Sequence, residues 1–110
     1  MARYILIDNA SGYIWGDSSD INGKIVNGTP IDVARALDKD VGEFLDREYR
    51  EVGRRQLASN ETGYHVYHVY RADIDGSEVI GPITDGSDQD MIEAVERDCE
   101  YECTIKCIML

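Results

Sequence analysis

The chain has little positive charge, few cysteines and no long hydrophobic run. Only 11 Lys and Arg residues stand against 22 Asp and Glu residues, which gives a net charge of −11. Such a chain repels nucleic acid and membrane surfaces, so we expect it to bind neither directly. No apolar stretch approaches the roughly 18 residues of a membrane-spanning helix. The run Tyr4–Ile7 leads straight into Asp8 and does not resemble a secretory signal.

The absence of several sequence features excludes further classes of protein. Three cysteines are an odd number, which does not suit a closed disulfide framework, so we expect a protein of the reducing cytoplasm. The sequence has no nucleophile elbow, phosphate-binding loop, dinucleotide-binding glycine pattern or zinc-protease motif. We therefore expect a protein that is not an enzyme and that uses no cofactor.

What is present suits one globular domain over residues 1–110. The chain is 43% hydrophobic, too apolar for a disordered acidic tail. Residues 3–8 are apolar on both faces, which is typical of a strand inside a sheet. Alternating or β-branched residues and turn signals together predict five strands, at residues 3–8, 13–15, 64–71, 78–81 and 99–109. A further short strand at residues 24–26 is an open alternative within the loop 16–28.

Helical spacing appears in two regions. Thr29-Pro30 is typical of a helix start, and the apolar stripe continues to Val41. Asp40 with Glu43 resembles a second capping box, so the helical pattern runs on to Val52 as one helix or two. In that helix Glu43 with Arg47 and Asp46 with Arg50 fall at i,i+4, which predicts a salt-bridged, solvated face.

The last helix begins after Ser87 as its cap and buries Met91, Ile92 and Val95. Hairpins joined by helices indicate an α+β fold. We predict a mainly antiparallel sheet of about five strands with two to three helices packed on one face.

Cysteine and histidine positions do not favour a metal site. Cys99, Cys103 and Cys107 are four apart, so on a helix they would share one face and could bind a metal. The alternating residues between them fit a strand better, where all three are core residues too far apart for one tetrahedral site. His65 and His68 have odd spacing on a strand, so we expect them on opposite faces.

The negative charge is regional. Residues 73–102 hold eleven carboxylates and one cation, Arg97, a net of −10, whereas residues 1–72 have a net of −2. Closely spaced carboxylates on a rigid frame can imitate a row of phosphates and occupy a basic groove. The simpler alternative is a solubilising face, with Asp88 and Asp90 favoured by the helix dipole. The candidate partner-binding residues are Asp88, Asp90, Glu93, Glu96, Glu100 and Glu102.

Two aromatic residues of the first hairpin could add an anchor to such a contact. Tyr13 and Trp15 are the candidates, although we expect both to be buried in the hairpin. An anchor would matter because charge speeds association more than it deepens affinity.

Three segments, Tyr4–Asp8, Ser11–Asp17 and Glu93–Asp98, resemble parts of small acidic phage and prophage proteins. Some of those are anti-CRISPR inhibitors of type I surveillance complexes. The resemblance implies an inhibitor that acts in the host cytoplasm, binds a basic surface of a CRISPR effector subunit and blocks target DNA binding. The alternative is an acidic interaction or regulatory module for another host or phage protein. The oligomeric state stays open, although exposed sheet edges can support a dimer.

Overall fold

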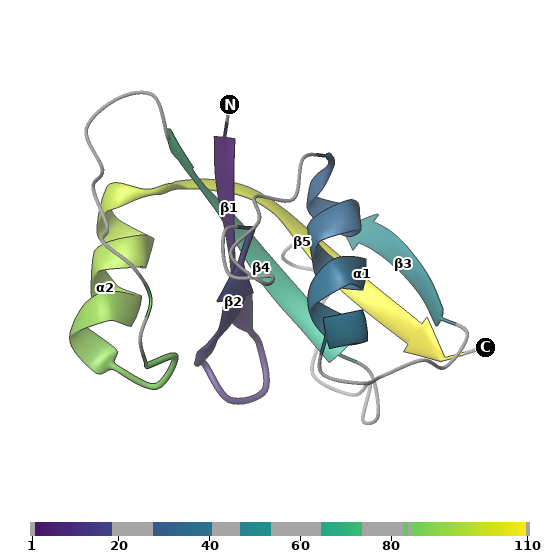
Figure 1. Cartoon of the computed structure of the whole chain (residues 1–110), viewed down its shortest axis with the longest axis horizontal. Coiled ribbons are helices and arrows are strands. Elements are labelled where there is room, and N and C mark those ends of the chain that lie inside the picture. Colours follow the sequence, from purple (N-terminus) through teal and green to yellow (C-terminus); the bar gives the residue numbers. More distant parts are fainter. Residues whose placement is uncertain are drawn as a thin grey trace.

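The computed structural model describes residues 2–18, 28–40, 47–53, 65–73, 83 and 85–109. Over these residues one five-stranded antiparallel sheet, in the order β2-β1-β4-β5-β3, packs with two helices (Figure 1). The predicted α+β class is confirmed. The elements are β1 Ala2–Asp8, β2 Ile14–Asp17, α1 Pro30–Asp40, β3 Arg47–Val52, β4 His65–Asp73, α2 Gln89–Asp98 and β5 Glu100–Met109.

The predicted hairpin at the start of the chain is confirmed. The Asp8 amide donates a hydrogen bond to the Tyr13 carbonyl at 2.8 Å, and the Gly12 amide donates one to the Asp8 carbonyl at 2.8 Å. Gly12 has a φ of 74°, a conformation that favours glycine, and the Asp8 carboxylate accepts from the Ser11 hydroxyl. β1 lies between β2 and β4, and its centre, residues 5–7, is buried, as expected of an internal strand.

The helices cover opposite faces of the sheet, which corrects the expectation that they share one face. Ile5 packs in an apolar cluster with Ile92 of α2. Its neighbour Leu6 packs in a second cluster with Val33 and Leu37 of α1. Consecutive strand residues point to opposite faces, so each helix covers a different one. The reason is visible in β1 itself, which is apolar on both sides and needs cover on both.

β3 is an edge strand where the sequence predicted helix. Residues Arg47–Val52 pair with β5, with Tyr49 opposite Cys107. Arg50 Nε bonds Glu48 Oε1 at 2.7 Å, two residues away on the same strand face, so the predicted helical i,i+4 face is wrong here. Local charge spacing suited a helix, but pairing with the open edge of β5 and burial of part of Tyr49 decided the outcome.

Other predicted features lie outside the described residues and stay predictions. These are the Glu43 end of the second capping box, the strand at 24–26, the loop at 58–63, the turn at 75–76 and the strand at 78–81.

A β-bulge changes which face the start of β5 presents. Val69 of β4 pairs with Cys103, but Tyr70 pairs with Tyr101, so Glu102 is an extra residue. The extra residue reverses the alternation and turns Tyr101 toward the face of Tyr70, where the two rings are 5.9 Å apart. Tyr101 was expected in the core, yet 38% of it is exposed.

Beyond the bulge, β5 has buried residues on both of its faces. Thr104, expected on a wet face, is fully buried and hydrogen-bonded to His68 at 3.0 Å. Ile105 and Cys107 are buried on the α1 side, as expected of core residues. Cys99 precedes the strand and ends α2, where it joins the apolar cluster of that helix.

α2 begins at a different cap from the one expected. Asp88 Oδ1 accepts from the amides of Asp90 at 3.0 Å and Met91 at 3.5 Å, whereas Ser87 donates to the Asp85 carboxylate.

Asp88→Ala should lower the free energy of unfolding by about 1 kcal/mol, because two amides lose their acceptor. Asp88→Ser keeps an oxygen acceptor and should cost less in urea denaturation. Equal losses in the two variants would show that the cap is not the source of the effect.

Candidate functional site: an acidic surface on α2 and β5

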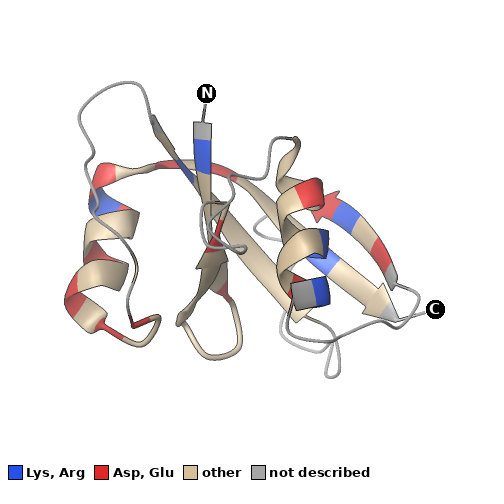
Figure 2. Ribbon diagram, viewed as in Figure 1, with Lys and Arg blue, Asp and Glu red and all other residues tan. Residues whose placement is uncertain are grey.

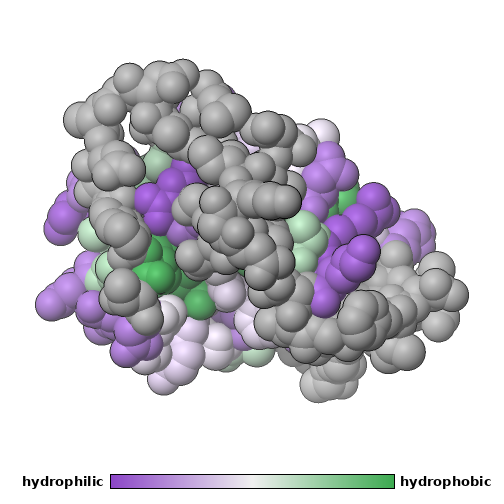
Figure 3. All heavy atoms as spheres, viewed as in Figure 1, coloured by the Kyte–Doolittle hydropathy of each residue, from purple (hydrophilic) through white to green (hydrophobic). Residues whose placement is uncertain are grey.

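Exposed carboxylates gather along α2 and the start of β5. All six predicted partner-binding residues are exposed, four on or just before α2 and two on β5. Figure 2 shows red segments along α2 and the first part of β5, and in Figure 3 hydrophilic residues cover the outer side of α2. We call this region the acidic surface; its residues are Asp88, Asp90, Glu93, Glu96, Glu100 and Glu102.

The helix supplies the most regular part of that surface. Asp90, Glu93 and Glu96 follow one another at three-residue intervals, so they lie along one side of α2. The opposite side carries Ile92 and Val95, which are 3% and 0% exposed and fix the rotation of the helix on the sheet. Among the described residues, no ion pair or side-chain hydrogen bond engages these three carboxylates. We call them the α2 row.

The α2 row ends at a cation. Arg97 follows Glu93 by one helical turn and holds Asp98 through two bonds, Nε–Oδ1 at 3.1 Å and Nη2–Oδ2 at 2.9 Å. The hydrogen bond to Arg97 lowers the pKa of the Asp98 carboxyl. The Asp98 charge is therefore neutralised locally, and only the part of α2 before Arg97 is uniformly acidic.

The other three predicted residues have different settings. The Asp88 carboxylate is occupied in capping α2. Glu100 pairs in register with Arg71 of β4, and Glu102 is the extra residue of the bulge. The regular two-residue spacing expected of Glu100 and Glu102 does not hold across a bulge. The structure thus brings Asp90, Glu93 and Glu96 into one row and places Glu100 and Glu102 beyond it on a separate element.

An exposed aromatic residue lies beside the start of α2. The Ile14 amide donates to the Gly86 carbonyl at 2.8 Å, so the first hairpin adjoins the turn that leads into the helix. A side chain at residue 86 would collide with the Ile14 carbonyl, which explains the glycine. Tyr13, expected to be buried, is 51% exposed. Tyr13 is thus available as an anchor next to the acidic surface.

A second polar cluster, which the sequence analysis missed, lies beneath α1. Asp38 is 1% exposed and accepts from Trp15 Nε1 at 3.2 Å, from the Tyr67 hydroxyl at 2.7 Å and from the Tyr49 hydroxyl. The Tyr67 hydroxyl also lies 3.1 Å from His65 Nδ1. The Asp38 cluster therefore joins α1 to β2, β3 and β4, and it leaves Trp15 half-buried and committed to the interior.

One signal in the sequence could have revealed Asp38. It lies four residues after Ala34 and seven after Ile31, so it falls on the apolar stripe of α1. A carboxylate on such a stripe must find donors, because burying it alone is costly. Its hydrogen-bond donors come from three strands, and no local sequence pattern predicts which residues they are.

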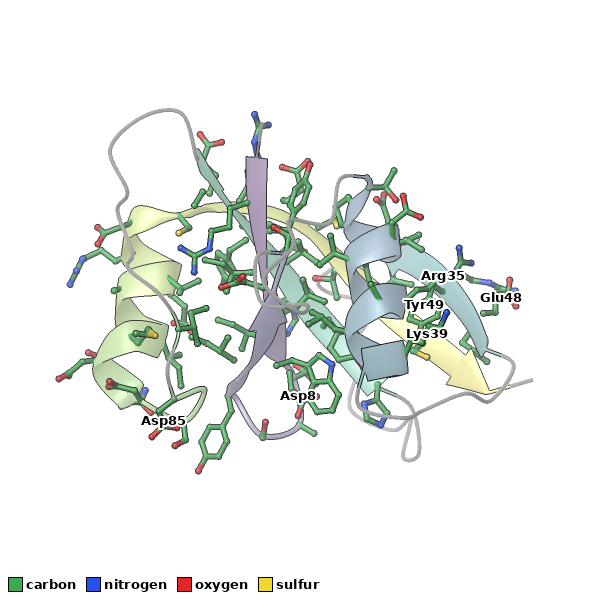
Figure 4. All side chains as sticks on the ribbon, viewed as in Figure 1. Asp8, Arg35, Lys39, Glu48, Tyr49 and Asp85 are labelled. Carbon is green, nitrogen blue, oxygen red and sulfur yellow. The ribbon has the colours of Figure 1, made fainter. Side chains whose placement is uncertain are left out.

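The Asp38 cluster suits structure better than catalysis. Burial, followed by the hydrogen bond to Asp38, raises the pKa of Tyr49 and of Tyr67 well above the usual range of tyrosine. Both hydroxyls therefore remain protonated donors at neutral pH. Arg35 of α1 adds a cation 5.3 Å from the centre of the Tyr49 ring (Figure 4).

The histidines and cysteines form no metal-binding group within the described ranges. His65 lies beside Trp15 on the α1 side, and His68 bonds Thr104 on the other face, as their spacing predicted. No group of three or more His, Cys, Asp or Glu side chains in this part of the chain could hold a metal ion. Burial raises the pKa of Cys99, and it raises that of Cys103 to about 12, so both stay thiols at neutral pH.

None of the helices described is long and apolar enough to cross a membrane.

Removing the Asp38 carboxylate should destabilise the fold strongly. Asp38→Ala leaves two tyrosine hydroxyls and an indole N–H without their acceptor, and we expect a loss of about 3 kcal/mol or more in the free energy of unfolding. Asp38→Asn keeps one acceptor oxygen and should lose less. Glu96→Ala, an exposed acid, is the control and should change stability by less than about 0.5 kcal/mol in urea denaturation. Similar losses for Asp38→Ala and Glu96→Ala would contradict the bridging role.

The same cluster predicts sensitivity to alkali. The pKa values of Tyr49 and Tyr67 are higher in the folded than in the unfolded chain, where tyrosine titrates near pH 10. Their contribution to stability is therefore complete below about pH 10 and is lost as pH rises above it. Urea denaturation across this range should show the decline, and Tyr67→Phe should make it shallower. An unchanged slope in the variant would exclude Tyr67 as a cause.

No family model, curated protein or solved structure matches this chain. The features of the chain that bear on its function are therefore the acidic surface, Tyr13 beside it and the resemblance of its sequence to acidic phage proteins.

Proposed function

We propose that this protein is a non-enzymatic inhibitor that binds a basic, nucleic-acid-binding groove through the acidic surface. The target that the sequence resemblance favours is a subunit of a type I CRISPR effector complex, with target DNA excluded. The observation that carries the proposal is the α2 row, in which three exposed carboxylates line one side of a helix whose other side is fixed in the core.

The chemistry of the α2 row fits a groove built for phosphates. Arg and Lys side chains that hold a DNA backbone form equally good charge-assisted bonds with carboxylates. Opposed charge over a whole surface also speeds encounter between the two proteins. The excess of negative charge in residues 73–102 supplies this attraction, and the nearly neutral remainder of the chain does not oppose it.

Tyr13, which lies beside the α2 row, would add binding affinity that charge alone does not provide. Tyr13 presents an aromatic ring at the end of the β1–β2 turn, just before β2, and it is 51% exposed. Buried tyrosines commonly carry a large share of binding energy at protein interfaces. A contact that included Tyr13 and the α2 row would therefore combine steering by charge with an apolar centre.

The test is target-DNA binding by purified type I surveillance complexes, measured by gel shift with and without the protein at two salt concentrations. We expect inhibition by the natural sequence, weaker at the higher salt because screening reduces the attraction. Glu93→Lys with Glu96→Lys should abolish inhibition, since it reverses two charges of the α2 row. Glu93→Asp with Glu96→Asp is the matched control, because it keeps the charges and should keep the inhibition.

Each outcome decides a different part of the proposal. Inhibition that survives the lysine reversals, with both variants folded by circular dichroism, would reject the α2 row as the contact. If no subtype of complex loses DNA binding at either salt concentration, the CRISPR target is rejected.

A second candidate function is an interaction module for a different host or phage protein, and the exposure of Tyr13 favours it. Such a contact would depend on the ring more than on charge. Binding to a captured partner should then fall at least tenfold for Tyr13→Ala, since a hot-spot residue contributes about 2 kcal/mol. It should change little for the lysine reversals or with salt, whereas the first proposal requires binding to fall in both tests.

A further inference from the structure

The outer edge of β3 pairs with no other strand among the described residues. β3 is the last strand in the order of the described sheet, where its neighbour is β5. Within the described part of the chain, no backbone group hydrogen-bonds to its second edge. Figure 1 shows β3 at the end of the sheet far from α2. Open edges are templates for pairing with another strand.

The charges of β3 are symmetric about Tyr49. The segment Arg47-Glu48-Tyr49-Arg50-Glu51 has Glu48 and Arg50 on either side of the tyrosine. If two copies pair antiparallel with Tyr49 opposite Tyr49, Glu48 of each copy lies opposite Arg50 of the other. The same register places sequence position 47, an Arg, opposite position 51, a Glu. Opposite charges that face each other across strands stabilise antiparallel pairing.

Neighbouring registers lose this complementarity. If the antiparallel pairing were centred on Arg50, the Arg50 side chains of the two copies would face each other. If it were centred on Glu48, the two Glu48 side chains would face each other. A centre between residues 49 and 50 would oppose Glu48 to Glu51. Parallel pairing in register would oppose every charge to its like. Among these arrangements, the charge pattern favours the antiparallel register centred on Tyr49.

The side chains in question are exposed on one face of the edge. The Arg50 side chain is 58% exposed and that of Glu48 is 38% exposed, and they form an ion pair at 2.7 Å within the strand. On its inner side Arg50 pairs in register with Lys106 of β5, a like charge. In the paired arrangement, Glu48 of a second copy would lie on the outer side of Arg50. In Figure 4 Glu48 lies at the outer side of β3 and Tyr49 nearer α1.

From this edge and its charges we infer that the protein forms a twofold symmetric dimer through antiparallel β3–β3 pairing, with Tyr49 at the centre. The four charged residues of β3 sum to zero, so repulsion between two chains of charge −11 is smallest at this edge. The dimer leaves both α2 rows free at the far ends of a continuous sheet. It does not rest on the proposed function, because it needs no partner protein.

The test measures the oligomeric state by analytical ultracentrifugation over a range of concentrations. The natural sequence should show a monomer–dimer equilibrium. Arg50→Glu and Glu48→Arg each replace two attractive cross-strand pairs with two repulsive ones, so each should weaken the dimer about tenfold or more. The double variant Glu48→Arg with Arg50→Glu restores opposite charges in this register and should dimerise again.

A mixing experiment identifies the contact. Arg50→Glu presents two acids at positions 48 and 50, and Glu48→Arg presents two bases. The two single variants should therefore form a heterodimer when mixed, although each alone associates weakly. Glu93→Gln, remote from β3, is the control and should leave the dimer unchanged. Circular dichroism checks that each variant is folded.

Several results would overturn the inference. A natural sequence that stays monomeric at NMR concentrations would do so. A dimer that both single variants leave intact would place the contact elsewhere. Failure of the folded single variants to associate when mixed would exclude this register. A complex in which β3 pairs with a strand of a different protein, and never with a second copy of this chain, would exclude it as well.

Discussion

The fold depends on one buried carboxylate. Asp38 gathers donors from Trp15 on β2, Tyr49 on β3 and Tyr67 on β4, and so fixes α1 over strands that lie far apart in the sequence. A carboxylate in the interior loses its hydration, and hydrogen bonds must compensate for that loss. The Trp15 indole and the two tyrosine hydroxyls provide three such hydrogen bonds. The arrangement makes the position of α1 specific in a way that apolar contact alone would not.

The other face is held by different means. Arg3 of β1 and Asp17 of β2 form a buried ion pair at 2.5 Å, and α2 packs through an apolar cluster with the same strands. Because α2 contributes mainly apolar side chains to this contact, its acids are left on the solvent side. The hydrogen bond between Ile14 and Gly86 then sets the β1–β2 turn beside the helix start. The acidic surface and Tyr13 are neighbours for this reason.

Charge divides the molecule along the sheet. The α2 end carries a dense set of carboxylates, whereas β3 at the other end has equal numbers of acids and bases. A basic partner would be drawn to the first end, and a second copy of the chain would meet least repulsion at the second. The two proposed contacts are thus compatible, since neither covers the surface of the other.

Much of this follows from local pattern. The first hairpin, the strand at β4, both described helices and the charge of residues 73–102 are determined by alternation, turn residues and helical spacing, which act over a few neighbours. The exposure of Asp90, Glu93 and Glu96 follows equally from the apolar stripe opposite them. Each segment has these properties without any contact to the rest of the chain.

The tertiary structure decided what depends on partners distant in sequence. β3 became a strand because β5 offered an open edge, although its charges also suited a helix. The bulge at Glu102 reversed the face of Tyr101, because pairing with β4 required an extra residue there. Asp38 found three donors that no spacing rule connects to it. Local pattern therefore accounts for the charge and for most elements, whereas packing decided the β3 strand and the partners of each element, because long-range contacts carry no local periodicity.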